Sequence, residues 1–310
     1  MIYISENNWW SWRYGSGPYF GRQSGNDQFR TFYKKTDRKI YNFKIELENA
    51  AKSTLDHYPG LRPCIFFSGG VDSELILRSY INIGSNPKVY IVRYENDYNI
   101  YDVSYAITIC SILNINYSII NFNLQKFYEN DAMSIVEDAQ IDRAKILPHL
   151  KFTDCADGLI IVGLGDVYWS RMSDNYSEPG VWLAPDFEFD IGCDKYNILH
   201  NRSAIFQWWK WSPGLLISYT QLDWFKNLVS DKFYGKMGIN STKIKGFREY
   251  YPDLIVRKKQ TGFEKIDRLI QEFEESILKK YKIFPWRNTV ERTLDQFYLE
   301  IVGISYCEYH

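Results

Sequence analysis

Six consecutive residues, Ser68-Gly69-Gly70-Val71-Asp72-Ser73, combine the groups that bind a nucleotide phosphate. Two adjacent glycines let the backbone approach a pyrophosphate without side-chain interference. Ser68 and Ser73 offer hydroxyl donors, and Asp72 offers a carboxylate for a magnesium ion that neutralises phosphate charge. The alternative is a plain turn in which Asp72 or Ser73 caps a helix.

The residues around this loop predict a strand before it and a helix after it. The apolar run RPCIFF occupies residues 62–67, and a helical pattern follows at about 73–83. Backbone amides at a helix N-terminus lack partners within the helix and carry partial positive charge, so phosphate oxygens are favoured there. Neither a Walker A sequence (GxxxxGK followed by Ser or Thr) nor the dinucleotide sequence GxGxxG is present.

The elements that must position this loop alternate between short apolar strands and longer helices. Because each strand is nearly all apolar, we expect each to be buried on both faces, as in a parallel sheet. The pattern predicts an α/β fold with a doubly wound, mostly parallel sheet of four or five strands. Strands are expected at about 62–67, 88–93, 116–121 and 158–162, with helices at about 73–83, 101–113 and 123–139.

The segments that flank this core have different patterns. Residues 1–38 are expected to form a loop-rich or small β extension, and residues 39–310 the main domain, which begins with a helix at about 39–57. The main domain is expected to contain the α/β core at about 60–170, a hairpin or insertion at 171–195, and a mostly helical part at about 197–310. Helical patterns there are IFQWW, LDWFKNLV, FEKIDRLIQEFEESILKKY and TLDQFYLEIVGI.

Composition argues against several classes of protein. A net charge of −1 provides no overall field that would attract a polyanion, so a nucleic-acid partner is not indicated. The five cysteines are scattered without a CxxC pair, which argues against a structural zinc site or a disulfide framework. Neither a leader sequence nor a run of about 18 apolar residues occurs, so we expect a cytoplasmic protein with no membrane partner.

The loop SGGVDS resembles the PP-loop, SGGxDS, of the ATP pyrophosphatase superfamily. Enzymes of that superfamily have an adenine nucleotide α-hydrolase-like fold and cleave ATP between its α and β phosphates. The resemblance implies that ATP and Mg²⁺ are used here, with residues 68–73 at the pyrophosphate and Asp72 as a metal ligand.

Two further stretches follow in the chain. The fourth strand leads into Gly163-Leu164-Gly165-Asp166, and ligands of open α/β sheets lie beyond the carboxyl ends of strands, so Asp166 should face the same crevice as Asp72. The stretch RKKQTGF begins at Arg257 and is either a solvated basic cluster or a source of a lysine that stabilises a departing pyrophosphate.

SGGVDS, GLGD and RKKQTGF in this order resemble the synthetase domain of asparagine synthetases, over residues of about 40 to 270. The resemblance implies that Asp72 and Asp166 hold magnesium and that Asp166 and Lys259 are catalytic, with Lys259 stabilising pyrophosphate. It also implies an AMP-forming ligase that adenylylates a carboxylate or carbonyl oxygen for attack by an amine. Leu164 stands where that family has glutamate, which puts aspartate as the acceptor in doubt.

The nitrogen donor and the acceptor stay open. Glutamine-dependent members of the family carry a glutaminase domain whose catalytic cysteine follows Met1, whereas Ile2 follows it here. We therefore expect ammonia from the free pool, from a separate glutaminase, or another amine. The acceptor is a small molecule or a nucleobase.

Four other functions share some of these features. Thiolation of tRNA would need a reactive cysteine, for which Cys155 and Cys193 are candidates, and a deazaguanine-type synthase would carry a four-cysteine zinc site that this sequence lacks. Modification of a nucleic-acid base would use aromatic residues with basic pairs such as Lys34-Lys35. A simple nucleotide-binding module would not need the charged set of Asp72, Asp166 and Lys259.

Overall fold

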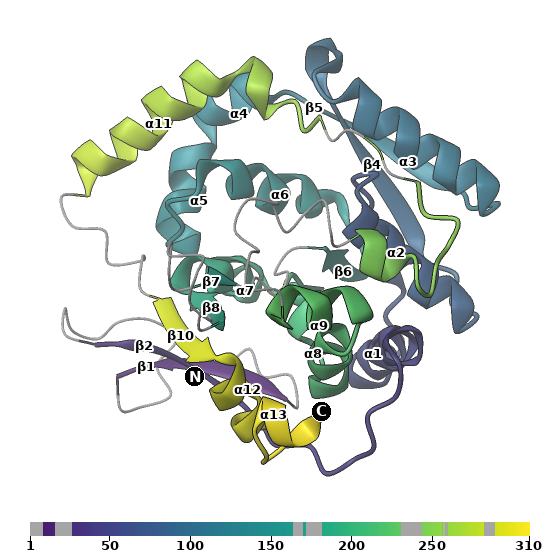
Figure 1. The fold of residues 1–310 in the computed structure, drawn as a ribbon. Coiled ribbons are helices and arrows are strands. Elements are labelled where there is room, and N and C mark those ends of the chain that lie inside the picture. The colour runs from purple at the N-terminus through teal and green to yellow at the C-terminus, as the bar shows by residue number, and fades with distance from the viewer. Residues whose placement is uncertain are drawn as a thin grey trace.

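The computed structural model describes residues 9–15, 27–163, 170–171, 182–230, 244–255, 257, 260–281 and 289–310. At its centre lies a parallel sheet of five strands in the order β5-β4-β3-β6-β9 (Figure 1). Because β4 and β5 lie on one side of β3 while β6 and β9 lie on the other, the winding direction changes between β3 and β6. The predicted doubly wound α/β fold is confirmed. The strands are β3 (Pro63–Phe66), β4 (Lys88–Tyr94), β5 (Tyr117–Phe122), β6 (Leu159–Val162) and β9 (Ala204–Ile205).

Helices cover both faces of this sheet, and alternate strand residues point to opposite faces. Ile65 and Ile161 belong to one buried hydrophobic cluster, whereas their neighbours Phe66 and Val162 belong to the other. The first cluster includes residues of α1 (Phe43–His57), α2 (Val71–Asn82) and α3 (Ile100–Ile112). The second includes residues of α4 (Leu124–Asn130), α5 (Ala132–Ala139), α6 (Leu147–Phe152) and α11 (Asp267–Lys280).

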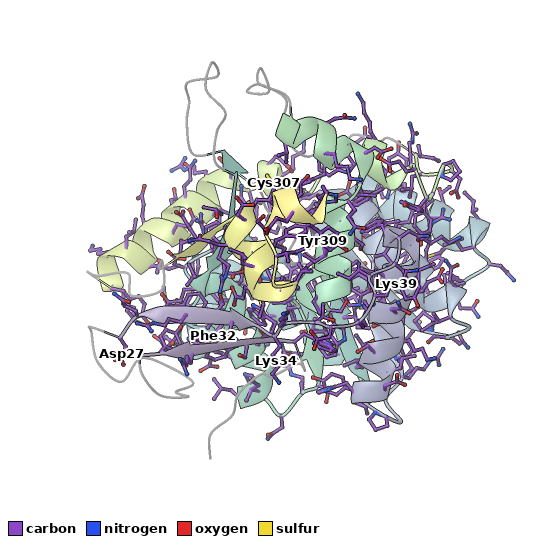
Figure 2. All side chains as sticks on the ribbon, turned by 60° about the horizontal axis from the view of Figure 1, so that its bottom comes forward. Asp27, Phe32, Lys34, Lys39, Cys307 and Tyr309 are labelled. Atoms are coloured by element: carbon purple, nitrogen blue, oxygen red, sulfur yellow. The ribbon has the colours of Figure 1, made fainter. Side chains whose placement is uncertain are left out.

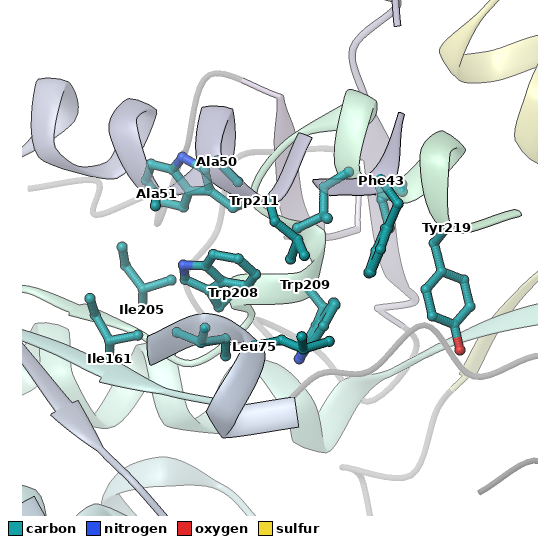
Figure 3. Packing of buried hydrophobic residues seen from close by; sticks show 14 of the residues in the cluster. Phe43, Ala50, Ala51, Leu75, Ile161, Ile205, Trp208, Trp209, Trp211 and Tyr219 are labelled. Carbon is teal, nitrogen blue, oxygen red and sulfur yellow. The ribbon is translucent and has the colours of Figure 1, made fainter. Parts of the chain in front are cut away.

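Tryptophans fill the first cluster. Trp208 and Trp209 lie in the 3-10 turn η5 (Trp208–Lys210), between α1 and the sheet, and Trp211 directly follows this turn (Figure 3). The rings of Phe43 and Trp209 are stacked at a centroid distance of 6.3 Å. Burying large rings in this way contributes strongly to core stability, and it anchors α1 over the strands that carry the loop.

Three sequence-based expectations are wrong in detail. β5 is mostly exposed, because it lies at the edge of the sheet and pairs only with β4 among the described strands. The helix expected at 123–139 is split at Asp131 into α4 and α5. The IFQWW stretch is not an α-helix, since it contains the end of β9 and the start of η5. The described C-terminal part is mostly helical, as expected, and it also contributes strand β10 (Thr289–Thr293).

Two small antiparallel sheets lie outside the central one. The expected N-terminal β element is the hairpin of β1 (Trp10–Tyr14) and β2 (Phe29–Tyr33). A second sheet has the order β10-β8-β7 and includes β7 (Ser170–Arg171) and β8 (Trp182–Phe187), while residues 172–181 lie outside the described part. Further helices within the described residues include α7 (Gly192–Leu199), α8 (Pro213–Thr220), α9 (Asp223–Ser230), α12 (Leu294–Ile301) and α13 (Tyr306–Tyr309). The remaining 3-10 turns are η1 (Glu95–Asp97), η2 (Ala144–Ile146), η3 (Thr153–Cys155), η4 (Glu188–Ile191) and η6 (Phe263–Lys265).

The N-terminal hairpin lies against the C-terminal helices, as Figure 2 shows for the side that carries Phe32 and Tyr309. A buried carboxylate joins these parts. Asp186 accepts hydrogen bonds from Thr31 Oγ1 at 2.7 Å, Lys210 Nζ at 2.7 Å and Arg292 Nη1 at 2.8 Å. Burial acts to raise the pKa of Asp186, but the charges of Lys210 and Arg292 hold it below its ordinary value.

None of the described helices is long and apolar enough to cross a membrane.

Candidate active site at the carboxyl edge of the sheet

A cavity of about 440 Å³ lies at the carboxyl ends of β3, β4 and β6. Its volume is in the range of small-molecule sites, and its place beside the switch point between β3 and β6 is where open α/β sheets bind ligands. It is lined by Phe66, Phe67, Ser68, Gly70, Asp72, Ser73, Tyr90, Val92, Tyr94, Asn99, Asp102, Lys145, His149, Phe152, Val162, Gly163, Thr261 and Phe263. Four residues of the predicted phosphate loop therefore lie in this lining.

Glycine at position 69 is required by the conformation of the loop. Gly69 has a φ of +75°, which L side chains rarely adopt, and a Cβ there would lie 2.3 Å from the carbonyl oxygen of Asp102. The loop therefore passes directly against α3. This close approach joins the β3–α2 turn to the helix that follows β4.

The loop leads directly into the N-terminus of α2. Gly70 is the N-cap and supplies no side-chain hydrogen bond, so the alternative in which Asp72 or Ser73 caps this helix is wrong. Ser73 Oγ instead donates to the carbonyl oxygen of Gly70 at 2.9 Å and lies 3.1 Å from Ser68 Oγ. The first-turn amides of α2 have no partner within the helix, which makes this end of α2 suitable for an anion.

Asp72 lies in the first turn of α2, and its side chain lines the cavity. Carboxylate and phosphate oxygens are the ligands that Mg²⁺ prefers, and Mg²⁺ commonly uses only one or two protein carboxylates. Asp72 therefore fits a metal that is shared with a bound phosphate. Among the described residues, no group of three or more His, Cys, Asp or Glu side chains gathers as a protein-only metal site. Asp166 lies outside the described residues, as do Leu164 and Gly165.

The stretch RKKQTGF reaches this cavity from a distant part of the chain. The amide of Gln260 donates to Asp102 Oδ1 at 3.0 Å, and Thr261 and Phe263 line the cavity. Lys258 and Lys259 lie outside the described residues.

Arg257, at the start of the same stretch, is bound to α2. Its Nη2 lies 3.1 Å from Oε2 of Glu74, and the Arg257 side chain is only 7% exposed. Glu74 is fully buried and also pairs with Arg78 at 2.8 Å. Arg257 therefore connects the stretch to the helix that carries Asp72, and the alternative of a fully solvated basic cluster does not hold for this residue.

An aromatic wall forms another side of the cavity. Phe66 is stacked on Tyr90 at a centroid distance of 5.2 Å and lies 5.3 Å from Phe152, while Tyr94 lies 5.8 Å from Phe263. Burial raises the pKa of Tyr94, so its phenol stays neutral. Of these residues, only Phe263 lies in one of the stretches that the sequence singled out for chemistry. The alternation of Tyr90, Val92 and Tyr94 in a single strand was the available signal, because such residues share one face.

Two basic residues, Lys145 and His149, line the cavity from η2 and α6, and the motifs did not indicate them either. Lys145 Nζ lies 3.7 Å from Asp267 Oδ1. The cavity thus joins a loop at the N-terminus of a helix, an aromatic wall and a basic wall.

Comparison with known proteins leaves the family open. No protein-family model and no curated protein matches the sequence. Among solved structures, the chain is similar to the NMN synthetase from Francisella tularensis, with 13% identity and a TM-score of 0.31 over 78% of this chain and 95% of that chain. At this degree of similarity, the assignment of the fold rests on the sheet order itself.

Proposed function

We propose that this chain is an ATP-dependent ligase of the PP-loop type, which adenylylates a carboxylate or carbonyl oxygen and releases pyrophosphate. One observation carries the proposal. The loop Ser68–Ser73, the Asp72 carboxylate and residues of the RKKQTGF stretch meet in one cavity at the carboxyl edge of a parallel sheet. A bare turn would not require a cavity of this size or the approach of a segment almost 190 residues away.

Each wall of the cavity has a proposed role. The amides of the loop and of the first turn of α2, together with the Ser68 and Ser73 hydroxyls, bind the β and γ phosphates. The aromatic wall around Phe66 and Tyr90 takes the adenine ring by stacking. Asp72, with Asp166, would hold a magnesium ion, and that ion would neutralise the charge that develops on the leaving pyrophosphate.

Lys259 is proposed to donate to the pyrophosphate as the charge on it increases. The contacts of Arg257 with Glu74 and of Gln260 with Asp102 support this role, because they attach the residues on either side of it to α2 and α3.

The proposed reaction proceeds in two steps. An oxygen of the acceptor attacks the α phosphorus of ATP, the bond from that phosphorus to the bridging oxygen breaks, and the electron pair leaves with pyrophosphate. An amine then attacks the activated carbon and loses a proton, and AMP departs with the electron pair of the broken C–O bond. Ammonia, free or supplied by a separate glutaminase, is the simplest amine, which makes the reaction similar to that of asparagine synthetases.

The products distinguish this proposal from ordinary ATP hydrolysis. Incubation with ATP, Mg²⁺, ammonia and a panel of carboxylates should yield AMP and pyrophosphate, measured by ion-exchange chromatography. Asp72→Asn should abolish turnover by removing a metal ligand, and Lys259→Ala should lower it while calorimetry still shows ATP binding. Release of ADP and orthophosphate, or normal turnover in both variants, would refute the assignment.

A second candidate is a PP-loop enzyme that modifies a nucleobase or nucleotide. Thiolation is the least supported form of it, because burial raises the pKa of the Cys193 and Cys155 thiols, which disfavours the reactive thiolate. Amidation or deazaguanine-type chemistry stays compatible with the same cavity. The acceptor panel should therefore include carboxylate-bearing nucleotides.

A further inference from the structure

The cavity has a basic wall that the proposed ATP site does not use. Lys145 lies in η2 and His149 in α6, and the two elements are consecutive in the chain. Helical residues four apart lie on the same side, and both of these side chains line the cavity. Lys145 and His149 carry the two basic side chains found among the described residues of the lining.

This wall and the phosphate loop come from opposite faces of the sheet. The loop continues into α2, whose Leu75 belongs to the first hydrophobic cluster, whereas Leu147 and Leu150 of α6 belong to the second. A ligand in the cavity is therefore held between two separate groups of anion-binding donors. ATP bound through the loop would occupy one of them.

Two other polar side chains of the lining, Asn99 and Thr261, make hydrogen bonds within the protein. The Asn99 side chain accepts from the Tyr94 amide at 2.8 Å and donates to the Val92 carbonyl oxygen at 2.9 Å. Thr261 Oγ1 donates to Glu264 Oε1 at 2.9 Å. These groups shape the cavity, and their hydrogen-bonding capacity is already used in part.

Lys145 is held only weakly in its present position. Its ammonium lies 3.7 Å from Asp267, and both side chains are more than half exposed, at 56% and 53%. An exposed ion pair of this kind is weak, so a ligand anion can compete with Asp267 for the ammonium.

We propose that Lys145 and His149 bind an anionic group, a carboxylate or a phosphate, on the acceptor while its reacting oxygen faces the Ser68–Ser73 loop. The inference rests on the proposed function for the identity of the ligand as an acceptor. It defines the class of substrate: a small molecule that carries a negative charge in addition to the group that is activated.

Direct binding tests the anion site without any turnover. Succinate and inorganic phosphate are titrated separately into the protein, and the ring protons of His149, one of four histidines, are followed by NMR. We expect a saturable shift, with affinity lowered about tenfold in Lys145→Ala, because one charge-assisted hydrogen bond is lost, and restored by Lys145→Arg. Lys151→Ala is the matched control, since Lys151 lies in α6 together with His149 and pairs with Asp131 and Asp154 outside the cavity.

Absence of a saturable shift at His149, or equal weakening in the Lys145 and Lys151 variants, would overturn the proposal. This outcome is independent of catalysis. A protein that binds these anions at His149 but never releases pyrophosphate from ATP would instead refute the proposed function.

Turnover then distinguishes a carboxylate from a phosphate. Acceptors are offered in matched pairs, a dicarboxylic acid with its monoamide and a carboxylate-bearing nucleoside monophosphate with its nucleoside, and pyrophosphate release is measured. The charged member of one pair should be preferred, and Lys145→Ala should remove that preference by raising the KM for the acceptor about tenfold while the KM for ATP is unchanged. A rise in the KM for ATP alone would assign Lys145 to ATP and contradict the inference.

Discussion

Replacing Gly69 by alanine should disrupt both the stability of the fold and the binding of ATP, and the chain offers a close control at Gly84. The two glycines have nearly the same backbone conformation, with φ of +75° at Gly69 and +76° at Gly84. They differ in the space around them. A Cβ at Gly69 would lie 2.3 Å from the Asp102 carbonyl oxygen, whereas a Cβ at Gly84 would meet nothing within 4 Å.

The expected losses in the free energy of unfolding follow from this difference. Both variants incur the left-handed strain of an L residue, about 1 kcal/mol. Gly69→Ala adds an overpacking cost of about 2 kcal/mol, because the loop and α3 must move apart. We therefore expect a loss of about 1 kcal/mol for Gly84→Ala and about 3 kcal/mol for Gly69→Ala. Since Asp102 also holds the Gln260 amide, the same movement should weaken ATP binding in Gly69→Ala alone.

Urea unfolding followed by tryptophan fluorescence measures the two losses, and isothermal titration with ATP and Mg²⁺ measures binding. Equal destabilisation by the two substitutions would show that the close approach of Gly69 to α3 is absent. Unchanged ATP affinity in a folded but destabilised Gly69→Ala variant would show that this loop is not the nucleotide site. The first result would refute the packing argument at Gly69, and the second would refute the assignment of the nucleotide site to this loop.

Two further substitutions test charges buried in the fold. Arg257→Ala leaves Glu74 buried with Arg78 as its remaining partner, so we expect a loss of about 2 kcal/mol in urea unfolding, below the usual cost of an unpaired buried charge. No loss would show that Arg257 does not hold its stretch against α2. Burial and the charge of Asp190 raise the pKa of Asp194 to about 7, so this group favours folding most at low pH and its contribution is lost as pH rises from about 4 through 7. The stability of Asp194→Asn relative to the natural protein should therefore be about 3 kcal/mol greater at pH 8 than at pH 5, and a difference that does not vary with pH would contradict this.

The central strands were predictable because each is a short apolar run between turn residues. The predicted strand at 158–162 became β6, which is buried throughout, and the predicted strand at 62–67 became β3. The exposure of β5 was not predictable, because its isoleucines have the same pattern as those of an internal strand. Position in the sheet is decided by the order in which strands pair, and the composition of a single strand does not record it. Two-residue β9 is too short to carry any periodicity.

The parts of the candidate site also differ in how far the sequence could predict them. Ser68–Ser73 could be identified in the sequence because the proposed phosphate loop consists of contiguous residues with one local conformation. Lys145, His149 and Tyr90 line the same cavity, but they come from η2, α6 and β4 and meet only through the crossovers of the fold. The proposed reaction depends on one loop and can thus be inferred before its acceptor is known, because the residues proposed to select the acceptor are not joined by any motif. The anion titration at His149 addresses that second question directly, and it does so whether or not the nitrogen donor is known.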